Sequence, residues 1–187
     1  MMKQEMSITK IVFIAMLAAV VCVVTFFRFP LLGSKVHFAN TMCLLSGLLM
    51  GPVAGGLAAG FGSGLYDALW GGYDIIQCLI TFVSKFIMAW LCAKIAFSGG
   101  REAKNHGWNV AACIIGALSY VALYMLKTFV YQKFVYGFPA ETVWATMLSK
   151  LPGSLINAVV AMIVAPILYT AIGGALERGG LLRKMRA

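Results

Sequence analysis

The stretch from Val36 to Asp74 reads VHFANTMCLLSGLLMGPVAGGLAAGFGSGLYDALWGGYD, and it decides how the rest of the chain is divided. From Val36 to Tyr66 it contains no Asp, Glu, Lys or Arg. Such a run is too long for one ordinary membrane span of about 20 residues. Gly51-Pro52 interrupts it, because proline lacks a backbone donor and disfavours helix in the residue before it. The stretch therefore predicts two short helices, at about 38–50 and 53–70.

The composition of the whole chain is typical of an integral membrane protein. Of its 187 residues, 61% are hydrophobic and 11% are charged, whereas a soluble domain has about 45–50% apolar and about 25% charged residues. This balance excludes an ordinary soluble enzyme. It also excludes a disordered chain, which needs low hydrophobicity and high charge. Little room is left for a nucleotide-binding domain beside about five to seven spans.

Four further apolar runs predict helices at about 11–27, 75–97, 108–132 and 142–174. We therefore expect an all-α membrane protein, in which residues 1–187 form a single domain of six transmembrane helices. The termini and the connection between the fourth and fifth helices carry nine basic residues, among them Lys3. The first–second, third–fourth and fifth–sixth connections together carry three. Because loops rich in Lys and Arg stay in the cytoplasm, both termini are predicted inside. The net charge of +9 is thus interpreted as a topology signal and not as a nucleic-acid-binding patch.

Small residues recur at helical spacing. In lipid, small residues at positions i and i+4 let two helices approach closely. In the two short helices this pattern serves either internal packing or a surface that slides against a partner, and both interpretations stay open. The glycines concerned are Gly47, Gly51 and Gly55, then Gly56, Gly60 and Gly64, and the first helix repeats the spacing with Ala15 and Ala19.

Asp67, Lys85, Lys127 and Lys150 are ionisable residues within or at the edges of predicted spans. Burying such a group at the centre of a helix costs about 2.5–3.5 kcal/mol, so we expect each to face the bundle interior or water. An ion pair between Asp67 and Lys85 is one structural alternative. Extension of the Lys127 side chain to the membrane surface is another.

Each of these lysines continues a polar stripe at helical spacing. Most of the stripes fall in the outer half of the predicted bundle, which indicates a pocket that opens outward. Aromatic walls with a few polar groups suit a small flat-ringed ligand, and the lysine excess favours an anionic or carbonyl-rich one. The connection from Arg28 to His37 lies on the same side and is a candidate lid. The stripes comprise Gln77, Thr81 and Lys85; Tyr120, Tyr124, Lys127 and Tyr131; and Lys150, Ser154 and Asn157.

The sequence contains none of the common catalytic motifs. HExxH, GxSxG, a P-loop and paired carboxylates are all missing, and no two of the five cysteines form a CxxC pair. A binding role therefore fits better than an enzyme, and neither a metal nor a cofactor is expected. Any energy for transport would have to come from elsewhere.

The stretch from Val36 to Ala93 resembles the substrate-binding S components of energy-coupling factor (ECF) vitamin transporters. The matching features are a polar residue at the start of a helix, a Gly-Pro turn with a following glycine, a GS-x-L-x-D segment, a Gly-Tyr turn and a lysine late in the next span. They correspond to Asn40, Gly51-Pro52 and Gly55, Gly62 to Asp67, Gly72-Tyr73 and Lys85. Ala15 and Ala19 resemble the motif by which S components meet the coupling subunit.

The resemblance implies a six-helix bundle in the bacterial plasma membrane that binds a vitamin or vitamin precursor from outside. It would dock on a transmembrane coupling subunit with two ATPases and topple to release its substrate. The most similar group is the riboflavin, hydroxymethylpyrimidine and pyridoxine-like one, and the substrate itself does not follow from it. The predicted substrate-binding residues are Arg28, His37, Asn40, Asp67, Gln77, Thr81, Lys85, Tyr120, Tyr124, Lys127, Tyr131, Lys150 and Asn157, and the predicted partner interface is Ala15 and Ala19.

Two other functions stay open from sequence. The chain is alternatively a stand-alone secondary transporter or channel, with Lys85, Lys127 and Lys150 as a path for a small anionic metabolite. A small membrane enzyme or an assembly factor is the third possibility.

Overall fold

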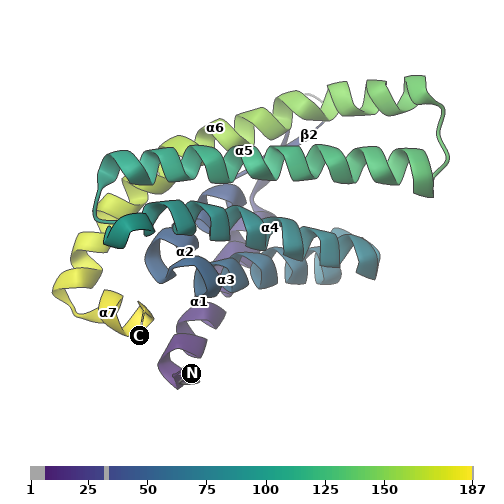
Figure 1. The fold of residues 1–187 in the computed structure, drawn as a ribbon. Coiled ribbons are helices and arrows are strands. Elements are labelled where there is room, and N and C mark those ends of the chain that lie inside the picture. Colours follow the sequence, from purple (N-terminus) through teal and green to yellow (C-terminus); the bar gives the residue numbers. More distant parts are fainter. Residues whose placement is uncertain (1–6, 32–33, 187) are drawn as a thin grey trace.

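The computed structural model describes residues 7–31 and 34–186, so Lys3 lies outside the described residues. It is almost entirely helical, which confirms the predicted all-α class (Figure 1). The helices are α1 (Ile8–Phe26), α2 (Ala39–Met50), α3 (Pro52–Tyr66), α4 (Ile75–Ala96), α5 (His106–Val130), α6 (Ala140–Arg178) and α7 (Leu181–Arg186). Short 3-10 or π turns follow α3, α4 and α5, at η1 (Asp67–Gly71), η2 (Ser98–Gly100) and η3 (Tyr131–Val135).

Four helical segments are long and apolar enough to cross a membrane: Ile8–Phe26, Ile75–Ala96, His106–Val135 and Ala140–Arg178. The helices α2 and α3 have 12 and 15 residues. At about 1.5 Å per residue they are shorter than the hydrocarbon core of about 30 Å. The described chain therefore contains four candidate spans, and a count of six membrane-spanning helices stays a prediction.

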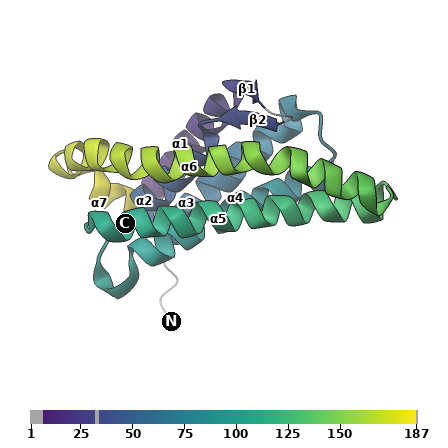
Figure 2. The same cartoon turned by 90° about the horizontal axis from the view of Figure 1, so that it is seen from above.

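Two segments differ from the sequence-based expectation. The connection after α1, predicted as a loop, forms an antiparallel β-hairpin of β1 (Arg28–Leu31) and β2 (Ser34–His37), in which Arg28 pairs with His37. The basic C-terminal tail forms α7, whose Leu182 and Met185 are buried. The hairpin packs against α6, and in Figure 2 it appears on the side of α6 away from α5.

The helix α6 is longer than predicted. It continues to Arg178, although Pro152 and Pro166 lie inside it. Membrane helices tolerate proline, because neighbouring helices and local adjustments satisfy the freed backbone groups. In Figures 1 and 2, α5 and α6 run side by side along the length of the molecule. Together they supply one whole wall of the bundle.

The centre of the bundle is built where α3 folds back on α2. Gly51 joins the two helices with φ 84° and ψ −177°, a backbone region that is essentially restricted to glycine. A β-carbon on Gly55 would lie 2.5 Å from the Cα of Gly47 and from the carbonyl oxygen of Ser46. A β-carbon on Gly62 would lie 2.4 Å from the carbonyl oxygen of Ala18 in α1. At these contacts the small-residue pattern serves internal packing, which was one of its two interpretations.

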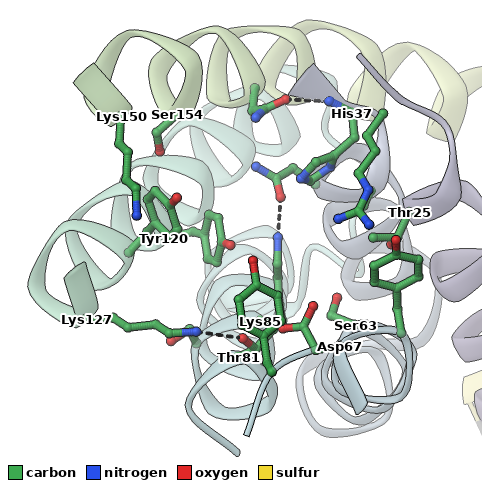
Figure 3. Close-up of a pocket in the computed structure, with 18 residues that line it drawn as sticks. Thr25, His37, Ser63, Asp67, Thr81, Lys85, Tyr120, Lys127, Lys150 and Ser154 are labelled. Carbon is green, nitrogen blue, oxygen red and sulfur yellow. Dashed lines mark hydrogen bonds between the residues drawn. The ribbon is translucent and has the colours of Figure 1, made fainter. Parts of the chain in front are cut away.

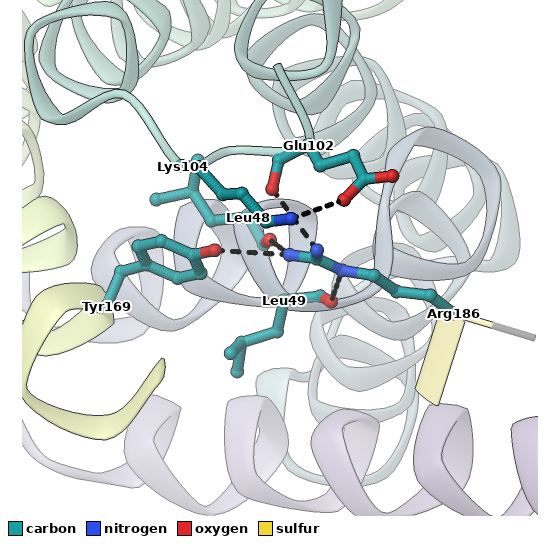
Figure 4. A network of polar contacts seen from close by, with 6 residues as sticks. All are labelled: Leu48, Leu49, Glu102, Lys104, Tyr169 and Arg186. Carbon is teal, nitrogen blue, oxygen red and sulfur yellow. Dashed lines mark hydrogen bonds and ion pairs between the residues drawn. The ribbon is translucent and has the colours of Figure 1, made fainter. Parts of the chain in front are cut away.

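The C-terminal helix closes one end of the bundle through Arg186 (Figure 4). Its guanidinium donates to the carbonyls of Leu48 and Leu49 at 3.1 and 3.0 Å. These are two of the last carbonyls of α2, which have no partner within their own helix. The same group donates to the Tyr169 hydroxyl at 3.1 Å, and Lys10 donates to the Arg186 carbonyl at 3.3 Å. The two ends of the described chain therefore meet at one end of the bundle.

The close approach of α2 and α3 gives a first prediction. Gly55→Ala places a methyl group against backbone atoms, which cannot rotate away, so we expect a loss of about 1–3 kcal/mol in the free energy of unfolding. Gly174→Ala is the matched control, because a β-carbon there meets no atom within 4 Å. Thermal unfolding in detergent measures both. Equal melting temperatures for the two variants would show that the α2–α3 contact is not tight.

Candidate substrate-binding site

A cavity of about 240 Å³ is lined by residues of the β-hairpin and of the helices α1 to α6 (Figure 3). All but two of the residues predicted to bind substrate line it. Gln77 and Tyr131 do not. Gln77 donates from its backbone N–H and its side-chain amide to Asp74, which caps the start of α4. Tyr131, at the start of η3, packs edge-on against Tyr136, which follows η3. The predicted residues in the lining are Arg28, His37, Asn40, Asp67, Thr81, Lys85, Tyr120, Tyr124, Lys127, Lys150 and Asn157.

The cavity has further lining residues that were not among the predicted ones. Two of them, Ser84 and Ser154, continue the polar stripes of α4 and α6, so helical spacing was a usable signal. The others carry no such signal, because they lie in an apolar run, a turn or the first helix. They are Thr25, Ala39, Ser63, Tyr66 and Tyr73.

The base of the cavity is formed by Lys85 of α4. Its side chain is 3% exposed, and its ammonium group donates to the amide oxygen of Asn40 in α2. The same group lies 3.6 Å from the ring centroid of Tyr120, within the range of a cation–π interaction. No ion pair joins Lys85 to Asp67 within the described part of the chain. The structural ion pair considered from the sequence is therefore absent, and the buried cation has only neutral partners.

Lys127 also points inward. Its ammonium group donates to the Thr81 hydroxyl at 3.2 Å and to the Gln77 carbonyl at 3.4 Å, which ties α5 to the start of α4. It lies 5.4 Å from the ring centroid of Tyr73. The side chain thus crosses to a neighbouring helix.

Aromatic rings form the remaining walls. Tyr120 and Tyr124 stack on α5, with centroids 6.2 Å apart and planes inclined by 23°. Across the cavity, Tyr66 is 2% exposed. The Arg28 guanidinium lies over its ring, 4.8 Å from the ring centroid. A site with aromatic faces and a few convergent polar groups is suited to a flat ring that carries hydrogen-bonding atoms.

The β-hairpin contributes Arg28 and His37 to the cavity lining, and a hydrogen bond attaches it to α6. The backbone N–H of His37 donates to the side-chain oxygen of Asn157 at 2.8 Å. The pKa of His37 is lowered to about 3, first by burial and then by the positive charges of Lys85 and Arg28. The imidazole is therefore neutral at physiological pH. It adds no charge to the cavity and leaves a buried Nδ1 without a partner among the described residues.

The attachment of the hairpin gives a second prediction. Asn157→Ala removes the acceptor of the His37 N–H, and an unsatisfied buried donor costs about 1–3 kcal/mol. We expect amide exchange in β2 to become about tenfold faster or more. Hydrogen–deuterium exchange mass spectrometry measures it. Thr170→Ala is the control on the same helix, since Thr170 is exposed and donates to its own helix. Unchanged exchange in β2 would mean that other contacts hold the hairpin.

Comparisons with known proteins agree with this architecture. A family model described as "ECF-type riboflavin transporter, S component" matches residues 5–173. A solved structure described as the S component of a bacterial ECF transporter superposes with a TM-score of 0.70, at 20% sequence identity. The match covers 89% of this chain and 96% of that chain, and at this identity it shows a shared fold. No curated protein matches the chain in sequence.

Proposed function

The chain belongs to the family of ECF-type riboflavin transporter S components, and from that premise we propose that it captures riboflavin or a closely related flat-ringed vitamin outside the cell. Members of this family are substrate-binding parts of a transporter and not enzymes. The observation that carries the proposal is the cavity, because it combines tyrosine walls with a buried lysine and amide at its base. Those groups match a planar ring that bears carbonyl oxygens.

The base of the cavity provides the recognition chemistry. Lys85 donates hydrogen bonds, and Asn40 both donates and accepts them. A ring carbonyl would take the ammonium hydrogens that have no partner, while the adjacent ring N–H would meet the Asn40 oxygen. The rings of Tyr120 and Tyr124 would cover one face of the ligand. A site built to pair buried polar groups rejects analogues that lack the matching atoms, which gives selectivity as well as affinity.

We propose that the cavity opens to the outside of a bacterial plasma membrane, with the β-hairpin as its lid and both termini in the cytoplasm. Two observations support this orientation. The basic residues concentrate at the termini and in the α4–α5 connection, and such residues favour the cytoplasmic side. In addition, the hydrogen bond between Lys10 and Arg186 holds the two ends of the chain together, as an even number of spans requires.

We further propose that transport depends on a separate coupling subunit with two ATPases, which α1 contacts through Ala15 and Ala19. Ile14, Ala18 and Val21 of α1 are buried against the bundle. Ala15 and Ala19 lie outside this buried stripe and are exposed. Small side chains on an exposed face allow a second helix to approach closely. The bundle would then topple on the partner to release its substrate inside.

Removal of the buried cation tests the binding role. Lys85→Met keeps the length of the side chain but loses the hydrogen bonds of a charged donor, which are worth about 1.5–3 kcal/mol. We therefore expect riboflavin affinity to fall by about tenfold to a hundredfold, as measured by quenching of flavin fluorescence. Lys94→Met is the matched control, because Lys94 is an exposed residue of the same helix. Equal affinity in all three proteins would remove Lys85 from the binding site.

A bulky side chain on the exposed face of α1 tests the partner interface. We expect Ala19→Trp to bind riboflavin like the parent protein but to lose copurification with the coupling subunit and ATPases, and hence ATP-dependent uptake. Ala122→Trp puts the same side chain on an exposed position of α5 and should retain both. Normal assembly of the Ala19→Trp protein would contradict the proposed interface. Robust uptake by the chain alone would contradict the dependence on ATPases.

A further inference from the structure

The cavity carries more positive charge than a neutral vitamin requires. Arg28, Lys85, Lys127 and Lys150 all line it, whereas Asp67 is the one carboxylate in the lining. None of the four cations forms an ion pair within 4.0 Å among the described residues. Uncompensated charges in a membrane protein are costly, and they mark sites where a substrate or ion supplies the missing charge.

Two of these cations lie apart from the base of the cavity. Lys127 is bonded to Gln77 and Thr81, in the first two turns of α4. Lys85 lies eight residues beyond Gln77, which is about 12 Å deeper along the helix. Lys150 comes from α6 and is half-buried, like Lys127. The lysine charges are therefore distributed between a deep position and a shallow one.

The two shallow lysines face the same space. Figure 3 shows Lys127 and Lys150 extending into the cavity from α5 and α6, with Tyr120 between them. Lys127 has two neutral acceptors, and Lys150 has no hydrogen-bond or ion-pair partner among the described residues. Asp67 begins η1 at the end of α3, on the other side of the cavity (Figure 3). The two lysines thus face the same part of the cavity, and neither forms an ion pair with Asp67 or with any other carboxylate of the described residues.

We propose, on the premise of the proposed function, that Lys127 and Lys150 form an anion subsite at the shallow end of the cavity. A flavin whose ring lies on Lys85 and Asn40 has its side chain directed toward this end. A terminal phosphate on that side chain would supply the anion between the two ammonium groups, and lysine binds phosphate as a mobile point charge. The chain therefore selects a phosphorylated flavin over the neutral vitamin.

A matched pair of ligands tests the subsite. Riboflavin and riboflavin 5′-phosphate share the ring and the side chain and differ only in the terminal phosphate. We expect the purified protein to bind the phosphate ester at least about tenfold more tightly, with most of the difference in the dissociation rate, as for a desolvated charge contact. In the Lys127→Gln and Lys150→Gln double variant this ratio should fall to near one. Lys133→Gln is the control, because Lys133 is exposed in η3 and outside the cavity lining.

The outcomes distinguish a failure of the anion subsite from a failure of the proposed riboflavin-binding function. Equal affinity for both flavins in the parent protein would overturn the subsite and leave the riboflavin-binding role intact. A preference that persists in the double variant, or that lies only in the association rate, would also overturn it, since the lysines would then at most steer the ligand. Failure of both flavins to bind would remove the proposed function and the subsite with it. Loss of the ratio in the double variant but not in Lys133→Gln would support the assignment.

Discussion

The amine of Lys85 is buried in an apolar bundle, and its partners among the described residues are one amide oxygen and one aromatic ring. A charge in a membrane helix costs about 2.5–3.5 kcal/mol or more at the centre, and neutral partners recover part of that cost. Two other residues of the cavity are placed so that they contact the Lys85 amine. Asn40 is fully buried at the start of α2 to accept from it, and Tyr120 presents its face from α5.

The close packing of α2 and α3 makes this arrangement possible. Because Gly47 and Gly55 carry no side chain, the two short helices fold directly against each other, and the start of α2 stays beside α4. At the opposite end of α2, Arg186 binds the last carbonyls and ties the C-terminal helix to the bundle. The helix α2 is therefore held at both ends, by Lys85 at its start and by Arg186 at its end, while the longer helices α4, α5 and α6 contribute the three lysines of the cavity lining.

Much of this architecture follows from local rules that sequence reveals. The break at Gly51-Pro52 and the stripe from Thr81 to Lys85 depend only on backbone chemistry and helical spacing. By contrast, Tyr66 and Tyr73 reach the cavity through the tertiary fold, and an aromatic residue in an apolar run gives no polar signal. The β-hairpin has too few residues for an alternating pattern.

The central claim is that the uncompensated Lys85 marks a site filled by a flavin. Native mass spectrometry of the protein, purified from its own cells in mild detergent without added ligand, tests it most directly. The account predicts a non-covalent adduct with the mass of riboflavin or of its 5′-phosphate. It further predicts that an emptied sample regains the adduct when the flavin is added. A bare chain that takes up neither flavin, or an adduct of a molecule without a flat ring, would contradict it.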